Sequence, residues 1–271
     1  MTQASKPARV LAIAGSDSGG GAGIQADIKT ISALGGYAMT AITALTAQNT
    51  QGVFGVHAAP PDFIRRQIAL VLEDIGADAL KTGMLHSAEV IGAVVEEVAR
   101  LAPDAPLVVD PVMVAKGGHP LLEPDAIAAV RDLLLPRATL LTPNLPEAEA
   151  LSGRRIVGPE GMAEAGRALL SLGAKAVLMK GGHLDGPEVT DLLVTPKGVR
   201  RFSHPRRQTS STHGTGCTLA SAIATGLGQG LALEAAVERG IAFVVAAMAQ
   251  APGLGKGHGP LGHTITVRPF P

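Results

Sequence analysis

The chain has 271 residues, and 46% of them are hydrophobic, so it can bury a substantial core as one large α/β domain or two small ones. Its 23 basic and 23 acidic residues give a formal net charge of zero, and aromatic residues make up only 2%. This balance excludes the basic surface typical of proteins that bind nucleic acids or anionic membranes, and it leaves few rings on which bases could stack.

The single cysteine, Cys217, excludes an internal disulfide and favours a reducing cytosol. The N-terminal residues do not form the charged and apolar regions of a signal peptide. The longest apolar runs are shorter than the roughly 20 residues that a membrane-spanning helix needs. We therefore expect a cytoplasmic protein with a disordered segment at residues 1–9 and one domain at residues 10–271.

The first half of the chain alternates strand-like runs with apolar residues at helical spacing. Strands are predicted at 10–14, 37–45, 53–58 and 79–84, and helices at 24–34, 61–75 and 88–98, the last capped by Ser87. The strands at 37–45 and 53–58 could pair as a hairpin outside the main sheet. Residues 37–58 would then form a small lid that excludes water from a site beneath it.

The second half repeats this alternation. Strands are predicted at 107–110, 139–142 and 176–180, an edge hairpin at 192–194 and 199–202, and helices at 124–135, 146–151, 159–172, 217–227 and 233–250. Strands that alternate with helices predict a mostly parallel sheet with helices on both faces. In such sheets, ligands bind at the carboxyl ends of the strands.

The most informative segment is residues 213–218, where Gly214 and Gly216 precede a helix of small residues. The first N–H groups of a helix have no partner within it, and the macrodipole places positive charge behind them. The segment therefore predicts a seat for an anion such as phosphate, and the helix start should lower the pKa of Cys217. Taken alone, the same pattern also fits an ordinary glycine-rich turn.

Polar side chains follow several of the predicted strands, and they should meet at one edge of the sheet. They are Asp17 and Asp27 after the first strand, then Asp110, Asn144, Glu147 and Lys180 after later ones. Carboxylates and a lysine beside an anion seat are what Mg²⁺-assisted phosphoryl transfer requires. Singly, each residue has a structural interpretation: Asp110 as a turn, Asn144 and Glu147 as a helix start, and Lys180 as an exposed strand end.

Other site chemistries fit less well. The loop at 15–23 resembles a dinucleotide loop, but no acidic residue closes a second strand about 20 positions on. Asp17 stands where a nucleophile elbow needs serine. The histidines lack metal-ligand spacing, and no P-loop occurs.

Six segments together resemble the bacterial hydroxymethylpyrimidine/phosphomethylpyrimidine kinases of the ribokinase-like superfamily. They are AGSDSGGGAGIQAD at 14–27, TALTAQNT at 43–50, VDPVM at 109–113, TPNLPEA at 142–148, LMKGGH at 178–183 and THGTGCT at 212–218. The resemblance runs from about Val10 to His263. It implies a three-layer fold with a mostly parallel sheet, flanking helices and a small β lid.

The resemblance also assigns expected roles. Cys217 would be the base, Gly214, Gly216 and Thr215 the anion hole, Lys180 and Asn144 the triphosphate contacts, Asp110 and Glu147 the Mg²⁺ ligands, and Gln48, Asp27, Gly15 and Met84 the substrate pocket. One departure concerns the nucleotide contacts: residues 209–212 lack the basic residue and Asn that often precede the THG motif.

The implied activity is ATP-dependent phosphorylation of 4-amino-5-hydroxymethyl-2-methylpyrimidine and then of its monophosphate, in a homodimer. A pyridoxal or pyridoxine kinase of the same superfamily is the nearest alternative. A binding protein without chemistry would not need the set formed by Asp110, Glu147, Lys180 and Cys217. A nicotinamide-dependent oxidoreductase is disfavoured by the missing acidic residue.

Overall fold

A computed structural model of the chain describes residues 6–115 and 118–267. In this part of the chain, nine strands form one sheet in the order β3-β2-β1-β4-β5-β6-β7-β8-β9. The strands are β1 (Arg9–Asp17), β2 (Tyr37–Asn49), β3 (Gly52–Ala58), β4 (Ala79–Thr82), β5 (Leu107–Val109), β6 (Leu140–Leu141), β7 (Val177–Met179), β8 (Glu188–Thr195) and β9 (Gly198–Pro205).

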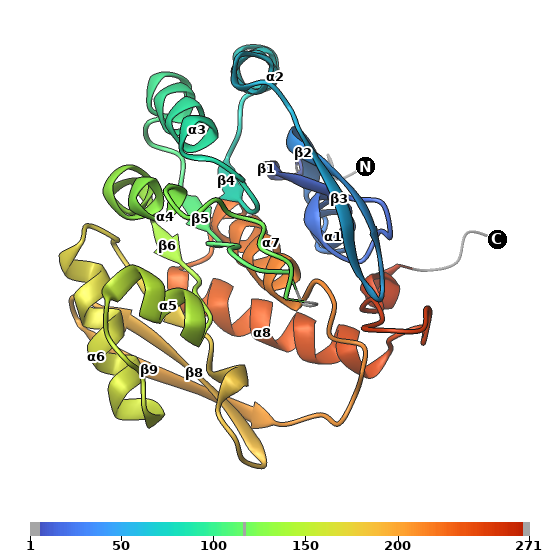
Figure 1. Cartoon of the computed structure of the whole chain (residues 1–271), viewed down its shortest axis with the longest axis vertical. Coiled ribbons are helices and arrows are strands. Elements are labelled where there is room, and N and C mark those ends of the chain that lie inside the picture. Colours follow the sequence, from blue (N-terminus) through green and yellow to red (C-terminus); the bar gives the residue numbers. More distant parts are fainter. Residues whose placement is uncertain (1–5, 116–117, 268–271) are drawn as a thin grey trace, which may run out of the picture.

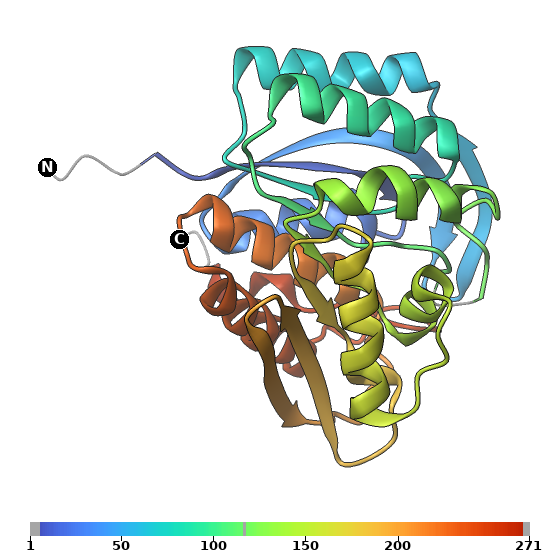
Figure 2. The same ribbon diagram turned by 90° about the vertical axis from the view of Figure 1, so that its left-hand side faces the viewer.

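Helices cover both faces of the sheet, as Figures 1 and 2 show. One face carries α2 (Pro61–Asp74), α3 (Ala88–Leu101), α4 (Ala126–Ala129), α5 (Leu145–Ser152) and α6 (Gly158–Ser171). The other face carries α1 (Gly23–Ala33), α7 (Thr215–Gly228) and α8 (Leu233–Ala249). This arrangement confirms the predicted three-layer fold. Within the described part of the chain, none of the helices has the length and apolar content of a membrane span.

The central strands are buried on both faces, which explains why they are short, continuous apolar runs. The Leu107–Val109 and Val177–Met179 strands have no exposed position. Helices add apolar stripes at helical spacing, as in α3, where Val90, Val94 and Val98 are buried. Each fully buried side chain of this kind contributes about 1.5–3 kcal/mol of transfer free energy.

Strand direction decides where the site lies. Strands β2, β1, β4, β5, β6 and β7 run parallel, so the segments that follow β1, β4, β5, β6 and β7 leave the same edge of the sheet. Strands β8 and β9 are antiparallel additions at one end and β3 at the other. The predicted convergence of strand ends is therefore present in the fold.

Three expectations about elements need correction. The first hairpin does not lie outside the sheet, because β2 pairs with β1 from Arg9 to Asp17 and only its last residues pair with β3 alone. The helix expected at 124–135 is α4 followed by η1 (Val130–Leu134) and η2 (Leu135–Arg137), because Pro136 cannot continue regular helical bonding. Of the segment expected to be disordered, residues 1–5 lie outside the described residues, Ala8 is buried, and Arg9 begins β1.

Candidate active site

Lys180 lies at the centre of the polar cluster at the strand ends. It follows β7 directly, and its Nζ lies 2.9 Å from Asp110 Oδ1 and 4.0 Å from Glu147 Oε2. Asp110 follows β5, and Glu147 lies in the first turn of α5. The structure thus brings together three residues that span 70 positions of the sequence, from Asp110 to Lys180.

Asn144 and Glu147 form a capping box, so the structural interpretation of these residues is correct. The Glu147 N–H donates to Asn144 Oδ1 at 3.0 Å, and the Asn144 N–H donates to Glu147 Oε2 at 2.8 Å. The cap does not use the NH₂ group of Asn144, a half-buried residue whose backbone forms an isolated β-bridge with Lys180. The cap therefore fixes both side chains at the site without using all of their hydrogen-bonding capacity.

The electrostatics of this cluster suit a divalent cation. Burial raises the pKa of Glu147 to about 7, with Lys180 opposing the shift and the charge of Asp110 adding to it. Two neighbouring carboxylates that repel each other are hard oxygen donors, and Mg²⁺ is usually held by one or two carboxylates plus phosphate and water oxygens. Among the described residues, no group of three or more His, Cys, Asp or Glu side chains is arranged to hold a metal ion.

The glycine-rich loop before α7 faces this cluster. Gly214 has φ of 80°, and a Cβ there would lie 1.9 Å from the carbonyl oxygen of Gly21, so only glycine fits. The Thr218 N–H donates to Gly214 O, so the N–H groups of the three preceding residues have no carbonyl one turn earlier to bind. At Gly216, a Cβ would lie 3.2 Å from Asp110 Oδ2 and 3.3 Å from Lys180 Nζ. The expected anion seat is thus beside the lysine.

Cys217 is half-buried in the first turn of α7. The expectation that its pKa is lowered is wrong. Burial raises the pKa of the Cys217 thiol to about 11, and the positive charge of Lys81 and a hydrogen bond from the Gly23 N–H oppose the shift only in part. The start of α7 was expected to lower this pKa, but desolvation of the thiolate has the larger effect.

Of the expected substrate-side residues, Gln48 lines a small cavity, and Gly15 and Met84 lie outside its lining. Its lining includes Gln48, Val53, Ala115 and His213. Gln48 is half-buried, and its Oε1 accepts a hydrogen bond from Thr46 Oγ1 at 3.0 Å. Met84 packs in one apolar cluster with Val53 and approaches the Gly15 backbone, where a Cβ would lie 3.0 Å from the Met84 sulfur.

Asp27 does not reach this cavity, which corrects its expected role. Its side chain is fully buried, and both carboxylate oxygens accept hydrogen bonds from Lys81 Nζ, at 2.9 and 3.0 Å. Ser221 Oγ donates to Asp27 Oδ1 at 2.7 Å. A carboxylate held by these two partners is a structural element beneath the site, and the roles of Gln48, Gly15 and Met84 in binding the substrate stay predictions.

The pairing of Asp17 with His213 was not predicted, although Asp17 and the segment that begins at His213 were both expected at the site. His213 Nε2 lies 2.8 Å from Asp17 Oδ2, and the same carboxylate accepts the N–H groups of Gly19, Gly21 and Ala22. Burial opposes ionisation, but these hydrogen bonds hold the pKa of Asp17 below its usual value. The pair therefore joins the first glycine-rich loop to the anion seat. The THG motif, with a histidine next to Gly214, was the available signal.

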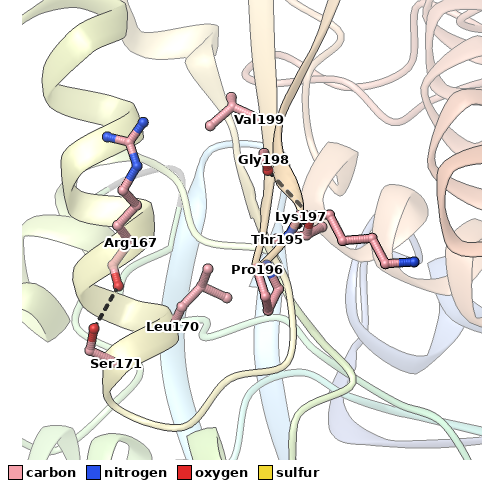
Figure 3. A pocket seen from close by; sticks show the side chains of 8 residues that line it. All are labelled: Arg167, Leu170, Ser171, Thr195, Pro196, Lys197, Gly198 and Val199. Carbon is pink, nitrogen blue, oxygen red and sulfur yellow. Dashed lines mark hydrogen bonds between the residues drawn. The ribbon is translucent and has the colours of Figure 1, made fainter.

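A larger surface groove of about 610 Å³ lies elsewhere, between α6 and the turn that joins β8 to β9 (Figure 3). Leu170 faces Pro196 across it, and Arg167 and Lys197 lie at its sides. Because β8 runs antiparallel to β7, this turn follows β8 at the edge of the sheet where β7 begins, whereas Lys180 lies at the edge where β7 ends. The groove is therefore separate from the candidate active site.

Comparisons with known proteins agree with this geometry. The sequence family described as "Phosphomethylpyrimidine kinase" matches residues 17–262. The hydroxymethylpyrimidine/phosphomethylpyrimidine kinase of Bacillus subtilis is 46% identical over 259 residues, which is 94% of each chain. The thiamine biosynthesis bifunctional protein ThiED of Geobacter sulfurreducens is 50% identical over 258 residues; these are 95% of this chain and 52% of that protein, so the chain spans about half of its length.

The fold is also similar to a solved pyridoxal kinase. The ADP complex of Bacillus subtilis pyridoxal kinase superposes with a TM-score of 0.89 at 36% sequence identity. The match covers 96% of this chain and 98% of that chain. The sequence identity is thus lower with this pyridoxal kinase than with the two relatives above.

Proposed function

Because the chain belongs to the hydroxymethylpyrimidine/phosphomethylpyrimidine kinase family, we propose that it phosphorylates 4-amino-5-hydroxymethyl-2-methylpyrimidine and then its monophosphate, with ATP as donor. The product is the pyrimidine half of thiamine diphosphate. The observation that carries this proposal is the convergence of Lys180, Asp110 and Glu147 on the glycine loop that precedes Cys217.

The donor side of the site would bind the triphosphate. Phosphoryl transfer depends mainly on positioning and on neutralising charge at the transferred group. Lys180 provides a positive charge, and the N–H groups of Thr215 and Gly216 provide dipoles that are fixed by the fold. The Asn144 NH₂ group is the further donor that we assign to the phosphates.

Asp110 and Glu147 would hold Mg²⁺. When bound there, the ion would neutralise phosphate oxygens as a Lewis acid. Lys180 is paired with Asp110 in this structure, and its ammonium has three N–H donors. We therefore expect it to bind phosphate oxygens as well when ATP is present.

The acceptor side would orient the pyrimidine and receive its proton. Gln48 carries both a donor and an acceptor, which matches a ring nitrogen next to an exocyclic amine. Cys217 would accept the hydroxyl proton in the first phosphorylation. Since its thiol has a pKa of about 11, only a small fraction is thiolate near neutral pH, and the first step should become faster as the pH rises.

Pyridoxal phosphorylation is the second candidate, and the structural similarity to Bacillus subtilis pyridoxal kinase favours it as a side activity. The test is a competition assay in which the purified protein receives ATP, Mg²⁺, the pyrimidine and pyridoxal together, with products separated by mass. Preferential pyrimidine phosphorylation supports the proposal, whereas preferential pyridoxal phosphorylation contradicts it.

The proposal also includes a cytoplasmic homodimer. Leu45 and Phe54 on the β2–β3 hairpin are exposed, by 53% and 72%, and a second copy could cover them. Light scattering after size-exclusion chromatography measures the assembly directly, and a monomer at micromolar concentration would contradict this part of the proposal.

A further inference from the structure

The C-terminal segment that follows α8 forms a strap against the site. We define the strap as residues 254–260. Figure 1 shows the red C-terminal part of the chain next to the end of the β2–β3 hairpin. The strap therefore meets a hairpin that is about 200 positions away in the sequence.

Thr50, at the tip of the hairpin, is the residue that the strap binds. Its carbonyl oxygen accepts the His258 N–H at 2.8 Å. Its Oγ1 accepts the Lys256 N–H at 3.1 Å and the Gly257 N–H at 3.2 Å. Three consecutive backbone donors thus bind one threonine.

The contact is too close for most side chains in the strap. At Gly257, a Cβ would lie 2.1 Å from the carbonyl oxygen of Thr50 and 2.9 Å from the Cα of Gln51. Both of these atoms belong to the backbone, so a side chain at position 257 would push the strap away from the hairpin. The glycine is therefore required by the contact itself.

The hairpin tip needs such an anchor. Strand β2 pairs with β1 only as far as Thr46, and beyond it Ala47, Gln48 and Asn49 pair with β3 alone. A two-stranded ribbon is marginally stable in water by itself. Gln48 lies in this extension, where Ser18 also binds its backbone.

The strap reaches the other parts of the site as well. His258 lines the small cavity together with Gln48 and His213. The His213 N–H donates to the carbonyl oxygen of Gly259, so the strap also binds the chain just before the anion seat. One segment therefore connects the hairpin that carries Gln48 to the loop that carries Gly214.

We propose that Thr50 and Gly257 are positioning residues for substrate recognition: they clasp the hairpin tip so that Gln48 faces the bound ring. This inference rests on the proposed function, because it assigns the clasp to the pyrimidine side of that site. Loss of the clasp should therefore raise KM for the pyrimidine and leave KM for ATP nearly unchanged, because the phosphates of ATP are proposed to bind at Lys180.

The test uses Thr50→Val, which keeps the shape of threonine but removes the Oγ1 acceptor, and Thr50→Ser, which keeps it. We expect Thr50→Val to raise KM for the pyrimidine about tenfold, given two lost hydrogen bonds, with KM for ATP unchanged. Thr50→Ser, which keeps the Oγ1 acceptor, should have a KM for the pyrimidine close to that of the wild type. Gly257→Ala should resemble Thr50→Val. The matched control is Gly55→Ala in the same hairpin, where a Cβ would only touch the Ala47 side chain, at 3.7 Å.

Hydrogen exchange tests the clasp without using activity. The Lys256 and Gly257 amides should exchange faster in Thr50→Val than in the wild type and Thr50→Ser. Unchanged exchange would overturn the clasp, and faster exchange with an unchanged KM for the pyrimidine would overturn its role in recognition. A wild-type protein that does not phosphorylate the pyrimidine would contradict the proposed function instead, and the exchange experiment would still decide whether the clasp exists.

Discussion

The Lys81 ammonium binds both carboxylate oxygens of Asp27, at 2.9 and 3.0 Å, and both side chains are fully buried. Ser221, which donates to the same carboxylate, lies one helical turn after Cys217 on α7. The positive charge of Lys81 also acts on the Cys217 thiol, whose pKa it lowers against the effect of burial. The buried pair therefore holds α7 through Ser221 and sets the charge next to Cys217.

We predict that Asp27→Asn destabilises the protein strongly. The change leaves a buried ammonium without its counter-charge, which costs about 3–5 kcal/mol of unfolding free energy in comparable cases. Urea unfolding measures the effect. The double variant Asp27→Leu with Lys81→Met removes both charges and should be closer to the wild type; a single variant as stable as the wild type would contradict this account.

Gln48→Leu should weaken pyrimidine use. The change leaves polar groups of the substrate ring unpaired, at a cost of about 1–3 kcal/mol. The measurement is kcat/KM for the pyrimidine, with KM for ATP as the internal control. If kcat/KM is unchanged, Gln48 does not recognise the ring.

Lys180→Ala should lower kcat more than it raises KM for ATP, because the ammonium neutralises charge that develops on the transferred group. Steady-state kinetics at saturating pyrimidine separate the two constants. The variant also removes the partner of Asp110, so its melting temperature is measured in parallel. A loss confined to KM would show that Lys180 binds only the ground state.

Cys217→Ala should impair the first phosphorylation much more than the second. A base for the neutral hydroxyl contributes roughly 10²–10⁴-fold, whereas the phosphate monoester, with a second pKa of about 6, is already ionised near pH 7.5. Single-turnover rates on the alcohol and on the monophosphate make the comparison. Equal losses on both acceptors would mean that Cys217 acts through packing.

The same residue predicts a pH profile. Because the folded-state pKa of Cys217 is raised to about 11, the thiol form prevails at neutral pH and the thiolate appears only as the pH rises toward that value. Alkylation by iodoacetamide reports on this group alone, since the chain has one cysteine. Its rate should increase about tenfold per pH unit below the pKa, and a plateau between pH 7 and 8 would contradict the burial effect.

The sequence predicted the layers and the strand ends because both follow from local patterns. Apolar runs such as Leu107–Val109 read as buried strands, and parallel order then placed Asp110 and Lys180 at one edge. It did not reveal the Lys81–Asp27 pair, because the burial of a lysine within a strand depends on residues 54 positions away. The contact between Thr50 and the strap was not predicted either, because the two are more than 200 positions apart and the strap donors are backbone N–H groups, which carry no residue-type signal.

We expect one site to phosphorylate the pyrimidine alcohol and then its monophosphate. The most direct measurement is a ³¹P NMR time course with purified protein, Mg²⁺, excess ATP and the pyrimidine as the only acceptor. The monophosphate should form first and then be converted to the diphosphate, with one ADP released for each transfer. A reaction that stops at the monophosphate, or ATP consumed without any phosphorylated pyrimidine, would contradict this expectation.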